Sequence, residues 1–201
     1  MRSSIARCRG AVDFPAPILE RHYMVPFTRA AGLPAHLRHW QRTVDQMLEG
    51  AEAPGRIYFM VDSGQVPAGA MLRRPGLHVD GHWLEHLRCH AHRQEPGPRR
   101  APGPRGVETG EHSPLSYPEA IILASDATGC EAFTGPWEAD VADDGEIASL
   151  DRSGMQHVVF EAGFAYAGNA AGMVHRSVPM QQECFRRVVR LNVQGWEPSA
   201  A

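Results

Sequence analysis

The sequence lacks any apolar run that could cross a membrane. A spanning helix needs about 20 consecutive apolar residues, and no stretch of the 201 residues approaches that length. The first ten residues, Met1–Gly10, are basic but contain no apolar core of the kind that a secretory signal needs. We therefore expect a cytoplasmic protein that has no membrane partner.

Cysteine is also scarce, and the cysteines present do not pair along the sequence. The four thiols are widely spaced and form no Cys-x-x-Cys motif; they are Cys8, Cys89, Cys130 and Cys184. Such spacing argues against a disulfide framework and against a cysteine zinc site. A reducing compartment is the expectation.

The chain has little net charge, and it lacks the sequence motifs of serine hydrolases and of phosphate-binding loops. Its formal net charge of -3 gives no global basic field, so nucleic acid is not favoured as a partner. Ser125-Asp126 lacks the Gly-x-Ser-x-Gly context of a serine hydrolase. The glycines do not form a phosphate-binding loop.

Glycine and proline, in contrast, are plentiful, and helical periodicity is rare. With Gly 20 and Pro 16, the composition suits a β-rich domain with many turns. One helix is predicted from Leu33-Pro34 to Gly50, because its apolar residues recur at spacings of three and four. These residues are Leu37, Trp40, Val44, Met47 and Leu48. Their stripe is expected to pack against the outside of a sheet.

Seven or eight short strands are predicted after this helix. The clearest runs are residues 56–61, 69–74, 77–80, 119–124, 132–133, 156–160 and 186–193. The turn residues 62–64 are expected to end the first of them, and the turn-rich pairs Ala162-Gly163 and Gly168-Asn169 follow the strand at 156–160. We expect one domain over residues 1–201, with an arm and helix at 1–55 and a β core at 56–194.

A long polar segment interrupts the predicted core. Residues 88–114 are rich in arginine, proline and glycine, and cannot bury enough apolar surface to fold alone. They are predicted to form a mobile loop, and loops of this length often act as lids or binding loops.

One constellation of residues indicates metal chemistry. His78 and Asp80 form the only His-x-Asp or His-x-Glu pair in the chain. Residues two apart on a strand point to the same side, and His175 comes from a distant strand as a third ligand. Two imidazoles and one carboxylate can hold a mononuclear Fe(II) ion while leaving positions open for a co-substrate and O2.

Arginines follow the third ligand at a spacing that indicates an anion site. Arg186 comes eleven residues after His175, and Arg190 lies four residues further on. On a strand both would share one face, where an inward guanidinium needs an anionic partner such as a carboxylate. Arg187, on the opposite face with the apolar residues, stays open as an alternative.

These residues resemble the Fe(II)/2-oxoglutarate-dependent oxygenases, especially the phytanoyl-CoA hydroxylase and taurine dioxygenase groups. The resemblance covers about residues 56–194 and implies a double-stranded β-helix, a jelly-roll or cupin-like barrel, with the helix packed outside. It implies that His78, Asp80 and His175 hold the catalytic Fe(II). It also implies that Arg186 binds the distal carboxylate of 2-oxoglutarate and that Arg190 lies near its C1 carboxylate.

The same resemblance implies an outcome for the reaction. O2 would drive decarboxylation of 2-oxoglutarate to succinate while a small-molecule substrate is oxidised. Because Asp80 leaves no vacant halide position, hydroxylation is favoured over halogenation, and desaturation and epoxidation stay open. The sequence specifies neither the substrate nor the oligomeric state.

Two other functions remain open from the residues alone. One is a cupin-like metal enzyme that does not use 2-oxoglutarate, and the other is a non-catalytic β-barrel binding module with a basic loop. His78 can also be an ordinary sheet histidine, and His175 can cap a turn. Two further sets of residues have possible binding roles. His82, His86 and His90 recur at a four-residue spacing that on a helix could bind zinc. Trp83 and Trp137 can line a pocket. No His-Glu-x-x-His pattern supports the zinc interpretation.

Overall fold

The structure, a computed structural model, describes residues 1–80, 119–142 and 144–198. These residues form a mainly β fold of two antiparallel sheets with a short helical segment. The elements in chain order are β1 (Arg2–Ser3), β2 (Ile5–Ala11), β3 (Glu20–Phe27), η1 (a 3-10 helix, Ala35–Trp40), α1 (Gln41–Met47), β4 (Ile57–Val66), β5 (Glu119–Ser125), β6 (Cys130–Pro136), β7 (Gln156–Val159), β8 (Phe164–Asn169), β9 (Val174–Ser177) and β10 (Cys184–Gln194).

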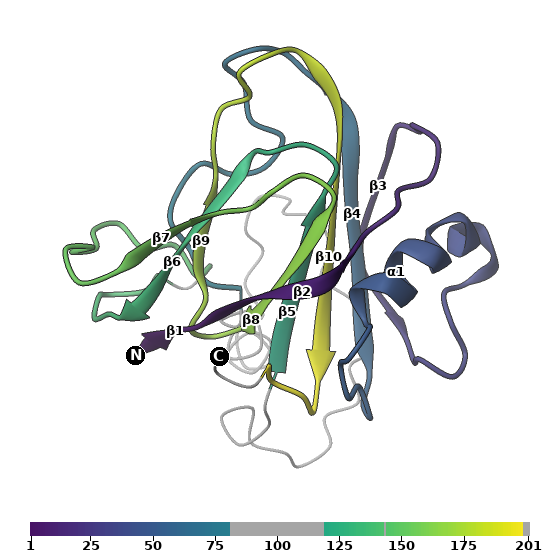
Figure 1. Cartoon of the computed structure of the whole chain (residues 1–201), viewed down its shortest axis with the longest axis horizontal. Coiled ribbons are helices and arrows are strands. Elements are labelled where there is room, and N and C mark those ends of the chain that lie inside the picture. The colour runs from purple at the N-terminus through teal and green to yellow at the C-terminus, as the bar shows by residue number, and fades with distance from the viewer. Residues whose placement is uncertain (81–118, 143, 199–201) are drawn as a thin grey trace, which may run out of the picture.

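The two sheets differ in size and lie in separate layers. The larger sheet has the order β2-β8-β5-β10-β4-β3, and in the smaller sheet β6 pairs with β1, β7 and β9. Figure 1 shows the smaller sheet on one side of the larger sheet and α1 on the other side. In the described part of the chain the strands do not close into a barrel, so the closed barrel expected from the sequence is not found.

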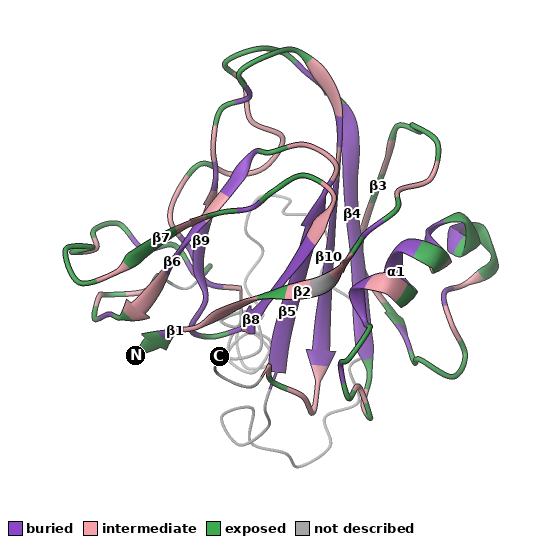
Figure 2. Cartoon of the chain, viewed as in Figure 1, coloured by how far each residue is buried: buried purple, intermediate pink, exposed green. Residues whose placement is uncertain are grey.

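The predicted helix is present and packs on the larger sheet as expected. Its apolar stripe is buried against the sheet face formed by residues such as Phe59, Val189 and Leu191. The first half is a 3-10 helix, in which residues three apart eclipse one another, so Leu37 and Trp40 point to the same side. Gly50 follows the helical segment with a positive φ of 78°. Figure 2 shows the buried residues concentrated in β4, β5 and β10.

The first predicted strand is longer than the sequence indicated. Residues 62–64 were expected to end it, but β4 continues to Val66 because each of its residues pairs with β10 as far as Cys184. Asp62 is buried and accepts a hydrogen bond from Arg21 Nη2 at 2.7 Å, which satisfies its carboxylate within the sheet. Long antiparallel pairing therefore overrides the local turn signal.

Two other strand predictions are wrong in detail. Residues 69–74 are not a strand: the chain turns at residues 68–69, where Ala70 N–H donates to the Pro67 carbonyl at 3.1 Å and Gly69 has a φ of 77°, and it bends at residues 72–73. Residues 77–80 are not a regular strand; His78 alone forms bridges, one to His175 and one to Glu146. Although residues 77–80 are not a regular strand, His78 still lies beside His175 through this bridge.

The N-terminal segment is more than an arm outside the core. Residues 1–55 supply β1 to the smaller sheet and β2 and β3 to the larger sheet. β3 contains Pro26, which the strand accommodates because it lies at the edge of the sheet. β8 was also missed: Ala165, Ala167 and Gly168 are small residues that carry little strand signal, yet they pair with β5 along its whole length.

Some predictions lie outside the described residues. These concern the loop at 88–114, the spaced histidines His82, His86 and His90, and Trp83. Trp137 is buried in a small core with Phe133 and Val174, and its Nε1–H donates to the Gly172 carbonyl at 3.1 Å. In the part of the chain that the structure describes, no helix is both long and apolar enough to cross a membrane.

Trp40→Ala should destabilise the fold strongly. Trp40 is fully buried between Phe14 and Phe59, with ring centroids 6.4 and 6.2 Å away. Truncation of such a side chain should lower the free energy of unfolding by about 3–5 kcal/mol, measured by urea denaturation. The exposed Val159 serves as control, because Val159→Ala should change it by less than about 0.5 kcal/mol. Equal effects of the two variants would contradict the assigned core.

Candidate metal centre

A pair of backbone hydrogen bonds brings the two predicted histidines together. His78 N–H donates to the His175 carbonyl at 3.0 Å, and His175 N–H donates to the His78 carbonyl at 3.1 Å. This antiparallel pair joins segments about a hundred residues apart and sets the imidazole ring centroids 4.2 Å from each other. The smaller sheet extends the arrangement, since His175 on β9 pairs with Ala132 on β6.

A second set of contacts holds the segment that carries Asp80. Val79 N–H donates to the Gly145 carbonyl at 3.0 Å, and Ile147 N–H donates to the Leu77 carbonyl at 2.8 Å. Gly145 has a φ of 84°, and a Cβ at this position would overlap the Val79 carbonyl oxygen. The close approach of the two segments therefore requires glycine there.

The three predicted metal ligands converge. One ligand atom from each of His78, Asp80 and His175 lies within 4.8 Å of the other two, and both histidines are buried. His175 Nε2 lies 3.3 Å from Asp80 Oδ2. Two imidazoles and one carboxylate at such distances can bind one ion on one face, which leaves the other face open.

The tautomer of each histidine favours metal binding. His78 Nδ1 lies 2.7 Å from the Gly76 carbonyl, and His175 Nδ1 lies 3.1 Å from the Met173 carbonyl. Because a carbonyl oxygen can only accept, Nδ1 must carry the proton in both rings. The lone pair is then on Nε2, and a backbone partner on the other nitrogen is the usual way in which proteins orient metal-binding imidazoles.

Electrostatics keep His78 and Asp80 in the protonation states that bind a metal. Burial and the neighbouring His175 lower the pKa of His78 to about 3, so its imidazole is neutral at pH 7. Burial alone would raise the pKa of Asp80, but Arg190 and His175 outweigh it and hold that pKa well below its usual range. The carboxylate is therefore ionised.

Arg190 is the ion-pair partner of Asp80. Its Nη1 forms a short ion pair with Asp80 Oδ2, and its Nη2 lies 2.9 Å from Met60 Sδ. Both side chains are buried, and Arg190 Nε has no hydrogen-bond partner among the described residues. Arg190 thus neutralises the carboxylate that a metal would bind. Its Nε–H remains a hydrogen-bond donor without a partner among the described residues.

Arg186 is a buried cation without an acidic partner in the described part of the chain. The residue is 0% exposed; Nε donates to Ser125 Oγ at 3.2 Å and Nη2 lies 3.1 Å from Cys130 Sγ. Within the described ranges Nη1 has no hydrogen-bond partner. A buried charge is costly unless it is paired, so this guanidinium has the properties of an anion-binding group.

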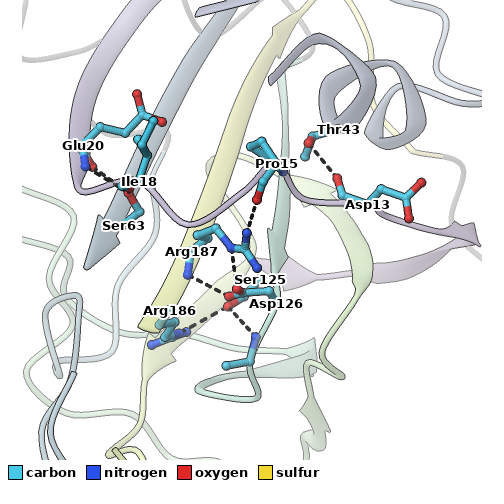
Figure 3. A network of polar contacts seen from close by, with 11 residues as sticks. Asp13, Pro15, Ile18, Glu20, Thr43, Ser63, Ser125, Asp126, Arg186 and Arg187 are labelled. Atoms are coloured by element: carbon cyan, nitrogen blue, oxygen red, sulfur yellow. Dashed lines mark hydrogen bonds and ion pairs between the residues drawn. The ribbon is translucent and has the colours of Figure 1, made fainter. Parts of the chain in front are cut away.

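Arg187 has a different environment from its neighbour (Figure 3). Its backbone N–H and its Nε both donate to the Asp126 carboxylate, at 2.7 and 2.6 Å, and its Nη1 donates to the Pro15 carbonyl. The charge of Arg187 is therefore satisfied within the protein. Of the two arginines that the sequence left open, Arg186 is the one with a buried donor that has no partner among the described residues.

The sequence analysis did not single out a buried polar pair beside the centre. Glu119 Oε1 accepts a hydrogen bond from Asn192 Nδ2 at 2.7 Å, while Glu119 Oε2 and Asn192 Oδ1 have no partner among the described residues. Burial raises the pKa of Glu119 to about 7. The sequence feature that could have revealed this pair is Glu119 itself, a carboxylate at the start of the otherwise apolar run 119–124.

Comparison of this chain with protein-family models, with characterised proteins and with solved structures finds no match. The site therefore has to be interpreted from its own geometry.

Glu119→Gln should change how stability depends on pH. The folded chain binds the Glu119 proton more tightly than the unfolded chain, because the pKa rises from 4.5 to about 7. Its stabilising contribution is thus present below pH 4.5 and lost as the pH rises through 7. At about 1.36 kcal/mol per unit, the variant should be more stable than wild type at pH 8 by up to roughly 3 kcal/mol, and similar at pH 4. Urea denaturation in the presence of a chelator measures this, and parallel pH curves would contradict it.

Proposed function

We propose that this chain is an Fe(II)- and 2-oxoglutarate-dependent oxygenase that hydroxylates a small-molecule substrate with O2 in the cytoplasm. The observation that carries the proposal is the presence, in one interior, of a metal-ready triad and a buried unpaired guanidinium. Two imidazoles and a carboxylate suit Fe(II), and a guanidinium suits a carboxylate. Neither feature alone would separate this activity from other metal chemistry.

The strand pairing supports a double-stranded β-helix as the scaffold. From β4 onward the chain alternates between sheets: β4 is in the larger sheet, and His78 bridges to the smaller one. β5 returns to the larger sheet, β6 and β7 belong to the smaller, β8 to the larger, β9 to the smaller and β10 to the larger. In a double-stranded β-helix such winding encloses one interior between the sheets, and in this proposal the triad would lie on one side of that interior and Arg186 on the other.

The position of Arg186 relative to the triad fits a short dicarboxylate. Arg186 contacts Cys130, and Cys130 pairs with Ser177 on β9. His175 is two residues from Ser177, which is about 7 Å along a strand. These contacts place Arg186 on strands that neighbour the triad, as a ligand with one end at the metal and the other at the guanidinium would require.

Each group of the chain has a role in this proposal. When bound, Fe(II) supplies O2 activation, and 2-oxoglutarate supplies two electrons as it is converted to succinate and CO2. His78 presents a neutral Nε2 atom and Asp80 an ionised oxygen, so metal binding at neutral pH requires no proton loss from these two residues, and His175 supplies the second imidazole. Arg186 binds the distal carboxylate, and Arg190, once Asp80 binds a cation, can donate to the C1 carboxylate.

Anaerobic titration with Fe(II) and 2-oxoglutarate tests the proposal through the weak visible charge-transfer band of the chelate. Wild type should show the band, and His175→Ala should lose it because a ligand is removed. Arg186→Lys should weaken 2-oxoglutarate binding by about tenfold or more, since the paired geometry of the guanidinium is lost. Arg187→Lys is the matched control and should bind as wild type does, because Asp126 satisfies that charge.

Each contrary result of this titration favours a specific alternative. Iron binding without the band, unaffected by Arg186→Lys, would favour a cupin-like metal enzyme that does not use 2-oxoglutarate. Absence of iron binding, together with tolerance of His78→Ala, would favour the non-catalytic binding module.

Gly129→Ala should weaken 2-oxoglutarate binding without removing any ligand. A Cβ at Gly129 would lie 2.6 Å from Arg186 Cζ and 2.8 Å from Met180 Sδ, so the guanidinium would have to move. The affinity for 2-oxoglutarate should fall while Fe(II) affinity is retained, and both are measurable in the same titration. Gly154→Ala is the control, because a Cβ there meets nothing within 4 Å. An unchanged affinity in Gly129→Ala would argue against Arg186 as the binding group.

A further inference from the structure

Arg73 is a partly buried cation whose hydrogen-bond donors are not used by the described residues. Its side chain is 28% exposed, and its Nη1 lies 3.9 Å from Asp62 Oδ2. That distance is longer than a hydrogen bond, which spans about 2.7–3.2 Å, and Arg73 donates no hydrogen bond to any described residue. A guanidinium has five N–H donors. Arg73 is therefore open to a ligand that solvent can bring to it.

Asp62 does not balance Arg73 fully, because a second arginine binds the same carboxylate oxygen. Arg21 Nη2 donates to Asp62 Oδ2 at 2.7 Å, a normal hydrogen-bond distance. Two guanidiniums thus share one carboxylate, which leaves one positive charge in excess. A charge in a partly buried position is costly unless it is paired, so this excess favours an anionic ligand.

This excess charge lies near the candidate metal centre. Asp62 and Met60 are two residues apart on β4 and so share a face of the larger sheet. Met60 Sδ lies 2.9 Å from Arg190 Nη2, and Arg190 is paired with Asp80. Burial lowers the pKa of Arg73 most, the charge of Arg190 lowers it further, and the carboxylate of Asp80 raises it. An anion bound at Arg73 would therefore lie beside the metal ligands.

The segment that carries Arg73 is anchored on both sides of it. Gly69 N–H donates to the Met180 carbonyl at 2.8 Å, and Met180 N–H donates to the Ala70 carbonyl at 2.9 Å. After Arg73, the reciprocal backbone bonds of His78 hold the chain. A binding group on an anchored segment loses less conformational freedom when a ligand binds.

The next residue, Arg74, has a partner that Arg73 lacks. Arg74 Nη1 lies 3.4 Å from Asp144 Oδ2, and its Nη2 donates to the Asp144 carbonyl at 3.1 Å. The chain thus satisfies one of two consecutive arginines and leaves the donors of the other available. Arg74 is for this reason a matched control for Arg73.

We propose that Arg73 binds an oxyanion of the substrate, a carboxylate or a phosphate, and so selects anionic small molecules for oxidation. The inference rests on the proposed function, since the metal centre would oxidise the bound molecule. One guanidinium can donate two parallel hydrogen bonds to such a group, which supplies the partners that Arg73 lacks. Arg186 contacts Ser125 on β5 and Arg73 contacts Asp62 on β4, with β10 between these strands. Substrate and co-substrate would therefore bind to different cations.

The test is isothermal titration of the full metal-free chain with benzoate and with benzamide, two probes of similar shape of which only benzoate is charged. Arg73→Gln should weaken one equivalent of benzoate binding by about tenfold, because a charged hydrogen bond is lost. It should leave benzamide binding unchanged. Arg74→Gln should behave as wild type does, and any benzoate bound at Arg186 is common to all these chains. Phenyl phosphate, titrated in the same way, shows which oxyanion Arg73 prefers.

Arg73→Lys is the second variant, and it should lose only part of the benzoate affinity because it keeps the charge without the planar fork. Equal benzoate binding by wild type and Arg73→Gln, or an equal loss in Arg74→Gln, would overturn the proposal. A lower Tm of Arg73→Gln with unchanged benzoate binding would instead make Arg73 a structural partner of Asp62.

The chelate band separates this inference from the proposed function. Arg73→Gln should keep the Fe(II) and 2-oxoglutarate band of wild type, and its loss would overturn the inference by making Arg73 a co-substrate group. Absence of the band from wild type would contradict the oxygenase assignment. The benzoate titration needs no metal, so the two failures are distinguishable.

Discussion

The reciprocal backbone hydrogen bonds between His78 and His175 are the contact on which the candidate centre depends. They place two imidazoles from distant segments side by side, and they do so with backbone atoms, so that both side chains stay available. The neighbouring carbonyls of Gly76 and Met173 then fix the tautomers. The position of the imidazoles thus follows from the backbone pairing, and their tautomers follow from these two carbonyls. Regular strand structure at residues 77–80 is not needed, because one bridged residue is enough.

The buried charged side chains differ in whether they have a partner of opposite charge, and this difference bears on their roles. Asp80 has Arg190 as a partner, whereas the partners of Arg186 among the described residues are a hydroxyl and a thiol, those of Ser125 and Cys130. A fold selected for stability alone has little reason to bury a guanidinium of this kind. The chain supplies an acidic partner for the adjacent Arg187 on the other strand face. The different treatment of two consecutive arginines supports a ligand for one of them and a structural role for the other.

Much of this arrangement could be predicted from the sequence where a residue pattern carries its own signal. The helix was predicted from the periodic spacing of apolar residues such as Leu37, Trp40 and Val44, and β5 was predicted from an apolar run. β8 could not be predicted, because Ala165 and Ala167 are placed in a strand by pairing with β5, not by propensity. The continuation of β4 past residue 62 likewise depends on β10, which is more than a hundred residues away in sequence.

The candidate site also has features that the sequence could predict and features that it could not. The identities and spacing of His78, Asp80 and His175 were visible in the sequence, because metal ligands need particular side chains. The choice between Arg186 and Arg187 was not visible, since it depends on where Asp126 lies in space. The Arg190–Asp80 ion pair was also hidden, and it changes the interpretation of metal binding: a cation entering the triad must compete with a guanidinium for the same oxygen. The freed Arg190 then faces a site that has just gained positive charge. Under the proposed function, an anionic co-ligand would relieve both excesses, and the buried arginines would favour binding of the metal and of a dicarboxylate together over binding of the metal alone.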